Sequence, residues 1–117
     1  MASTYQDLRV WQQSMDLAEA LYRAAECFPK YETYGLASQM RRAAVSVPCN
    51  IAEGKGRRTD KEFALYLFHA RGSLLEIETQ VHLARRLQYL GEDKASELLG
   101  LTKAVGSSLA GLINSVR

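Results

Sequence analysis

Only a few residues of this 117-residue chain have types and spacings that could support catalysis or metal binding. Glu78 and His82, at the i,i+4 spacing of a helix, supply two metal ligands at most, and His69 is the only other histidine. A di-iron site in a helical bundle needs Glu-x-x-His pairs on two helices, and the sequence has none. Nucleophile turns of the GxSxG type and Walker-type phosphate loops are also missing. We therefore expect no enzymatic activity, no metal site and no cofactor.

Basic residues are the remaining candidates for a functional site. The chain has 15 Lys and Arg against 13 Asp and Glu, which gives a net charge of +2. In four helices of alternating direction, one end collects the cations Arg9, Lys55, Arg57, Arg58, Lys61 and Arg117 and the anions Asp7, Glu53, Asp60 and Glu62. The net excess lies at this end, where an oligomer would multiply it into a binding surface for nucleic-acid phosphates. For a single chain, the simpler interpretation is a solvated loop whose charges keep the protein in solution.

Two adjacent arginines in the second helix have a different setting. If the second and third helices are antiparallel about a turn near Arg57, Arg42 comes within reach of Glu76 or Glu78. We expect Arg41 and Arg42 to join an ion-pair network between the two helices, with a free phosphate-binding arginine as the alternative. No aromatic residue stands among the basic residues of the turn, which weakens the case for recognition of single strands.

Four segments repeat apolar residues at helical spacing, and these helices must position the charged residues. The stripes are Leu8, Trp11, Met15, Ala18, Tyr22 and Ala25; Leu36, Met40, Ala43, Val47 and Ile51; Phe63, Leu67, Ala70, Leu74, Ile77, Val81 and Ala84; and Leu98, Leu101, Val105, Leu109, Leu112 and Val116. The first helix should run from about Asp7 to Cys27, because Pro29 pushes the residue before it out of the helical region.

Turn and cap residues predict the other boundaries. Gly54 and Gly56 should end the second helix by taking positive φ, and Pro48 inside that helix predicts a kink or a break. Thr59 and Glu62 have capping-box spacing at the start of the third helix. That helix should reach Leu90 before Gly91 ends it.

These helices predict an all-α fold, an antiparallel up-down-up-down four-helix bundle that forms a single domain over residues 1–117. Cys27 and Cys49 lack CxxC spacing, which favours two buried thiols in the reducing cytoplasm. The N-terminus has no secretory signal, and no apolar run approaches the roughly 20 residues that span a bilayer. We therefore expect a cytoplasmic protein without a membrane partner.

The fourth helix favours self-association. From Ala104 to Val116 it carries no charge, and small residues lie on several of its faces, whereas a surface helix normally keeps a charged side. A homo-oligomer would cover this stretch; small residues that admit a neighbouring helix of the same bundle explain part of the pattern. Gly72 in the third helix similarly suggests a close helix crossing, which would compensate for its low helix propensity.

Three motifs carry a resemblance to a known family. They are "YGLASQMRRAAVSVPCNIAEGKGR" from Tyr34 to Arg57, "DLRVW" from Asp7 to Trp11 and "GSLLEIETQ" from Gly72 to Gln80. In combination they resemble the four-helix-bundle proteins encoded in intervening sequences of bacterial 23S rRNA genes, whose relatives include the accessory proteins of diversity-generating retroelements. The resemblance spans essentially the whole chain. Cys49 departs from it, since that position usually resembles Ser or Ala.

The resemblance implies a bundle that assembles as a homopentamer. For the retroelement relatives it implies binding of RNA and of a reverse transcriptase through basic surface, and for most members it implies no established biochemical role. The matching motif residues are Arg41, Arg42, Pro48, Asn50, Glu53, Gly54, Gly72, Glu76 and Glu78. We interpret them as determinants of fold and assembly. Asn50 and Glu53 should satisfy backbone or arginine donors, because a partly buried carboxylate without a partner is costly.

Two functional hypotheses follow. In the first, a non-enzymatic oligomer binds RNA, or nucleic acid more generally, without reading its sequence; the contact residues would be Arg9, Lys55, Arg57, Arg58 and Lys61. In the second, the oligomer is a protein-interaction scaffold of unknown role that docks a partner protein, and the basic end is incidental. Steep salt dependence of RNA binding separates the two hypotheses.

Overall fold

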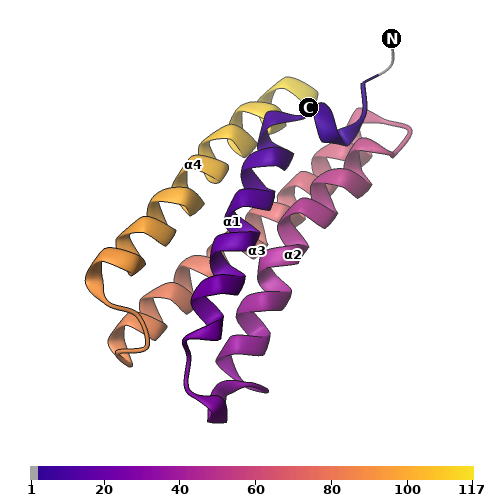
Figure 1. Cartoon of the computed structure of the whole chain (residues 1–117). Helices are drawn as coiled ribbons and strands as arrows, with labels where there is room; N and C mark the ends of the chain where they lie inside the picture. Colours follow the sequence, from indigo (N-terminus) through magenta and orange to yellow (C-terminus); the bar gives the residue numbers. More distant parts are fainter. Residues whose placement is uncertain (1–2) are drawn as a thin grey trace.

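The computed structural model describes residues 3–117, and within this range the chain is all-α (Figure 1). Its long helices are α1 (Arg9–Glu26), α2 (Leu36–Lys55), α3 (Asp60–Arg86) and α4 (Glu92–Val116), and two 3-10 turns, η1 (Tyr5–Asp7) and η2 (Lys30–Glu32), precede α1 and α2. No strand occurs between residues 3 and 117. The predicted all-α fold is confirmed.

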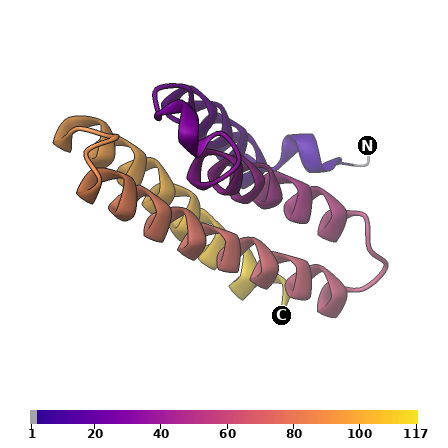
Figure 2. The same cartoon turned by 90° about the horizontal axis from the view of Figure 1, so that it is seen from below.

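The helices form an antiparallel up-down-up-down bundle. Consecutive helices run in opposite directions (Figure 1), and α1 and α3 each pack against both α2 and α4. Figure 2 shows the α1–α2 pair and the α3–α4 pair as two layers. The rod measures 45 × 24 × 22 Å. One end of the rod therefore holds the α2–α3 turn, the start of α1 and the end of α4, as predicted.

The core confirms two of the four predicted stripes in full. Every member of the α2 and α3 stripes is buried, from Leu36 to Ile51 and from Phe63 to Ala84. In α4, Leu98, Val105 and Leu109 are buried as predicted, and Thr102 and Ile113, which the predicted stripe did not include, are buried as well. Thr102 is accommodated because its hydroxyl donates to the Leu98 carbonyl oxygen at 2.7 Å.

The predicted stripe of α1 is confirmed for Ala18 and Ala25, which are buried, and in part for Leu8 and Trp11, which pack against the core, but it is wrong for Met15 and Tyr22. Met15 and Tyr22 are 45% and 40% exposed, whereas Ser14, Leu17 and Leu21 are fully buried. On two adjacent faces of this helix, apolar residues recur at three- and four-residue steps. The face centred on Leu17 packs into the bundle. The predicted stripe therefore lies along one edge of the buried face, not at its centre.

Several predicted helix ends are corrected. Gly54 is buried inside α2, Gly56 caps that helix with a φ of −82°, and no described glycine has positive φ. Helix α2 continues through Pro48 without a break. At α3, Thr59 is the N-cap as predicted, and its hydroxyl oxygen accepts from the Glu62 backbone N–H at 3.1 Å. The reciprocal half of the capping box is not formed, because the Glu62 carboxylate accepts from the Thr59 hydroxyl and not from its backbone N–H.

Helix α3 ends at Arg86 rather than near Leu90. The N–H groups of Tyr89 and Gln88 donate to the carbonyl oxygens of Ala84 and Arg85, at 2.9 and 3.0 Å. This pattern is a Schellman motif, which requires positive φ at the position after the cap. Gln88 supplies it with a φ of 65°, in place of the usual glycine, and Gly91 instead caps the start of α4.

One expectation about small residues is wrong, and another is not met inside the chain. Cys27 and Cys49 are both exposed free thiols, not buried ones. A Cβ built at Gly72 would meet no atom within 4 Å, so this glycine permits no close crossing inside the chain.

None of the helices within residues 3–117 has the combination of length and apolar character that a membrane span requires.

Candidate nucleic-acid interface

The structure places all the predicted contact residues at one end of the rod, but on more than one side of it. Lys55, Arg57, Arg58 and Lys61 lie on or beside the α2–α3 turn. Arg9, in the first turn of α1, instead lines a shallow hollow of about 370 Å³ with Gly111 and Ser115 of α4. The turn cations thus form one group, and Arg9 stands beside the C-terminal part of α4.

Arg57 is the most constrained of the turn cations. Its guanidinium lies 3.2 Å from the Glu53 carboxylate, donates to the Tyr66 hydroxyl and stacks 4.7 Å from the centre of the Tyr66 ring. Glu53 therefore accepts from an arginine, as predicted. Glu53 partly balances the charge of Arg57. The Arg57 guanidinium should therefore contribute less to phosphate binding than the exposed side chains of Arg58 and Lys61.

Aromatic rings lie among these cations, contrary to the sequence-based expectation. Besides Tyr66, the Phe63 ring lies 6.0 Å from the Lys55 ammonium. Both rings come from the first two turns of α3 and reach the turn only because α2 and α3 pack side by side. The sequence of the turn alone does not place these rings beside the cations. Their position follows from the antiparallel pairing of the two helices.

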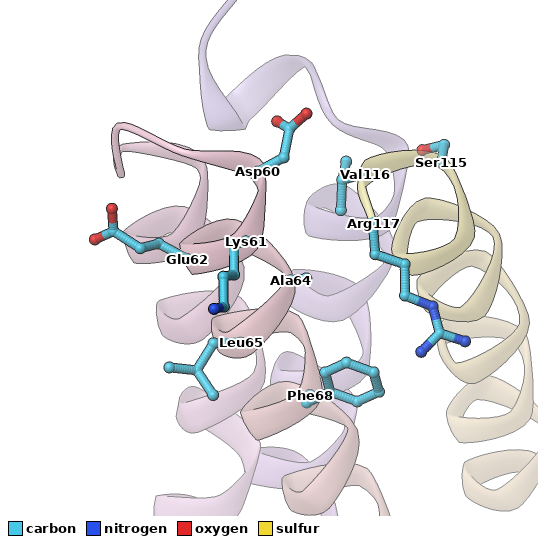
Figure 3. Close-up of a pocket in the computed structure, with 9 residues that line it drawn as sticks. All are labelled: Asp60, Lys61, Glu62, Ala64, Leu65, Phe68, Ser115, Val116 and Arg117. Carbon is cyan, nitrogen blue, oxygen red and sulfur yellow. The ribbon is translucent and has the colours of Figure 1, made fainter.

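A second group of cations surrounds Phe68. The guanidinium groups of Arg71 and Arg117 lie 5.2 and 5.7 Å from the centre of its ring. The ring lines a groove of about 770 Å³ between the start of α3 and the end of α4 (Figure 3). We call this the Phe68 groove; its lining residues are Asp60, Lys61, Glu62, Ala64, Leu65, Phe68, Ser115, Val116 and Arg117.

Arg41 and Arg42 do not make the ion pairs that the sequence suggested. Within residues 3–117, the ion pairs are Arg23–Glu19, Arg57–Glu53, Arg85–Glu92 and Lys94–Glu97. The guanidinium of Arg41 stacks 5.7 Å from the Tyr22 ring. Arg42 lines a shallow polar hollow with Glu76, but no ion pair joins them. The predicted network is therefore wrong, although the predicted proximity holds.

Hydrogen bonds replace ion pairs between α2 and α3. The hydroxyl oxygens of Ser46 and Ser73 are 2.8 Å apart, and the Asn50 amide donates to the Ser46 carbonyl and hydroxyl oxygens at 2.8 and 3.0 Å. Asn50 was predicted to satisfy backbone or arginine donors, but it acts as a donor to Ser46, so this prediction is wrong for Asn50. Ser46 and Ser73 lie abreast, which sets the helix turn two or three residues later than the assumed centre near Arg57.

Other motif residues serve packing or stand free. Pro48 is buried, and Gly54 lies against Tyr66 and Phe63. Gly72 and Glu76 are exposed, and Glu78 is half-buried. No group of three or more potential metal ligands gathers in the part of the chain that the structure describes.

The sequence patterns did not predict a large apolar surface on the bundle. A groove of about 580 Å³ between α1 and α2, the α1–α2 groove, is lined by Tyr5, Trp11, Met15, Asp16, Ala18, Glu19, Tyr22, Val45, Pro48, Cys49 and Ala52. On α3, the exposed leucines Leu75 and Leu83 lie eight residues apart and form a separate apolar surface, the α3 stripe. The available signal was the second set of residues at helical spacing in α1.

Comparison with known proteins identifies the chain. A crystal structure of a protein of unknown function from the S23 ribosomal protein family of Bacteroides thetaiotaomicron superposes with a TM-score of 0.83 at 18% identity, covering 89% of this chain and 97% of that one. No curated protein sequence matches the chain. The family model described as 23S rRNA-intervening sequence protein matches residues 6–111, nearly the whole chain. This chain therefore belongs to the 23S rRNA-intervening sequence protein family.

Proposed function

We propose that the protein is a non-enzymatic helical-bundle oligomer that binds RNA through its basic end without reading the sequence. The observation that carries the proposal is the convergence of cations from three separate segments, which are the start of α1, the α2–α3 turn and the end of α4 (Figure 1). Charges spaced along one end attract the phosphate backbone, and this attraction carries no base specificity.

Self-association supports the proposal because it multiplies a modest charge. The α1–α2 groove and the α3 stripe lie on different helices of the same chain, so they can meet on successive copies. Contacts between unlike surfaces are heterologous and close into a ring when the rotation permits. A ring, with five copies as the family resemblance implies, repeats the basic end around its axis.

The test is RNA binding by charge-reversal variants. Fluorescence anisotropy with a labelled mixed-sequence single strand should show affinity falling about a hundredfold between about 50 and 200 mM salt, for five phosphate contacts. Arg58→Glu with Lys61→Glu should weaken binding more than tenfold, because both side chains are exposed at the basic end. The matched control, Lys30→Glu with Arg86→Glu, makes the same charge change at the opposite end and should stay within twofold of the wild type.

The second candidate function is a scaffold that docks a partner protein. The exposed apolar α1–α2 groove favours it, since contiguous apolar surface marks protein interfaces. On that account RNA binding is undetectable near physiological salt, and the two double variants behave alike. Equal loss of RNA binding in both double variants would also contradict a site at the basic end.

A further inference from the structure

The Phe68 groove lies at the basic end of the rod and brings together apolar side chains, an aromatic ring and cations. Ala64, Leu65, Phe68 and Val116 supply the apolar part, and Leu65 is 54% exposed. The volume of about 770 Å³ lies within the range of small-molecule sites, roughly 300–1,000 Å³. The groove therefore has room for a nucleotide unit.

Two cations flank the Phe68 ring, and one of them, Arg117, also lines the groove. The guanidinium groups of Arg71, from α3, and Arg117, from the end of α4, lie within 6 Å of the centre of Phe68. A cation over an aromatic face is attracted by the ring quadrupole, so these contacts hold the arginines beside Phe68. Nucleobases stack both on aromatic rings and on guanidinium planes.

The acidic residues of the groove are directed elsewhere. Figure 3 shows the carboxylates of Asp60 and Glu62 pointing away from the Phe68 ring, while Arg117 extends beside it. A Glu62 oxygen lies 3.1 Å from the hydroxyl of Thr59, the N-cap of α3. The charges next to the ring are therefore positive, which suits a ligand with a flat apolar part and attached phosphates.

We infer that the Phe68 groove takes one unpaired base of a single-stranded nucleic acid, stacked against Phe68 and the Arg117 guanidinium. Lys61 and Arg71 then contact the adjoining phosphates. This inference rests on the proposed function and sharpens it, because a base within a duplex is already stacked on its neighbours and does not enter such a groove. The groove thereby gives the protein a contact with single strands that duplexes cannot make.

Anisotropy with two probes tests the inference: a labelled 12-nucleotide RNA and the same strand annealed to its complement. Phe68→Leu keeps an apolar side chain against the core but removes the ring, and should weaken single-strand binding about tenfold, since stacking on an aromatic contributes substantially per base. Duplex binding should change less than twofold. Arg117→Gln should weaken single-strand binding in the same direction. Tyr31→Leu, a 78% exposed aromatic at the opposite end, is the control and should change neither.

The outcomes separate this inference from the function on which it rests. If wild-type protein binds neither probe, the proposed function fails and the inference fails with it. If wild type binds with the expected salt dependence but Phe68→Leu binds both probes like wild type, only the inference is overturned. Equal weakening for both probes, or a changed molecular mass of Phe68→Leu in solution, also overturns it, because Phe68 would then act through folding or through contact between copies.

Discussion

At the scale of single residues, Gly54 sets how closely α2 approaches α3. A Cβ at this position would lie 2.7 Å from the Tyr66 Cβ and 3.0 Å from a Phe63 ring carbon. Both neighbours are held in place, because Phe63 is buried and Tyr66 stacks against Arg57. The same close approach brings Tyr66 beside the basic turn, so Gly54 also positions part of the candidate interface.

We expect Gly54→Ala to destabilise the fold by about 1–3 kcal/mol, because overpacking must displace Tyr66 or Phe63. Gly72→Ala is the matched control, since a Cβ there meets open space in the middle of α3. It should stabilise by about 0.5–1 kcal/mol through helix propensity alone. Urea unfolding of the three proteins measures both values. Equal effects at the two glycines would contradict the assigned packing.

Residue patterns predicted the core where only one face of a helix is apolar. In α2 and α3 that face was unambiguous, and every predicted core residue is buried. In α1, Leu17 and Met15 belong to neighbouring faces with the same spacing, and the predicted stripe included Ala18 and Ala25 at the edge of the buried face but missed its centre at Leu17. The difference is set by tertiary packing, because the Leu17 face is fully buried in the bundle whereas Met15 and Tyr22 line the open α1–α2 groove.

At the scale of elements, Glu32 serves the start of α2 from outside the helix. Gly35 is the N-cap and has no side chain, so a Glu32 oxygen accepts from the Leu36 N–H at 2.9 Å. The other Glu32 oxygen accepts from the Tyr89 hydroxyl at 2.8 Å. This bond joins the segment between α1 and α2 to the segment between α3 and α4. The Leu36 bond, followed by the Tyr89 bond, lowers the pKa of Glu32. Hydrogen bonds to Tyr31 and Glu32 raise the pKa of Tyr89.

Glu32 should make the stability depend on pH in acid. Its pKa is lower in the folded state, so its contribution is complete above the unfolded pKa of about 4.3 and is lost as pH falls through the folded pKa. Glu32→Gln should therefore flatten the fall of unfolding free energy below about pH 5, relative to wild type. Glu26→Gln, an exposed carboxylate near the same end, should leave that fall unchanged. An identical acid profile for Glu32→Gln and wild type would contradict the capping role.

Element boundaries followed from the sequence where one residue type decides them. Thr59 caps α3 as its spacing predicted. The end of α3 was missed because Gln88 takes positive φ, a conformation for which glycine is the usual indicator. The pairing of α2 with α3 was predicted correctly in kind, but its register was not, and Phe63 and Tyr66 were therefore not expected beside the basic turn.

At the scale of the whole molecule, three surfaces have properties unlike those of an ordinary monomer. The exposed side of α4 carries Ala104, Ser107, Ala110 and Gly111, with no charge from there to Val116. The α1–α2 groove and the α3 stripe add exposed apolar area on other sides of the rod. Burial of these surfaces between copies would leave the ends of the rod in solvent, including the basic end that we propose binds RNA.

The up-down topology and the location of the basic end were predictable from the sequence, because helix count and short connections fix both. The grooves were not, since a groove depends on which side chains stand on each side of a contact between helices. Phe68 illustrates the difference. It stands one position after the core residue Leu67, and its place between Arg71 and Arg117 depends on where α4 ends beside α3.

The most direct test of an RNA-binding oligomer is its molecular mass in solution, measured by light scattering with and without a mixed single-stranded RNA pool at two salt concentrations. An RNA-binding oligomer should give a particle of several 13.1 kDa chains, five on the family resemblance, that carries RNA at low salt and releases it at high salt. A 13.1 kDa species whose mass is the same with and without RNA at both salt concentrations would contradict it.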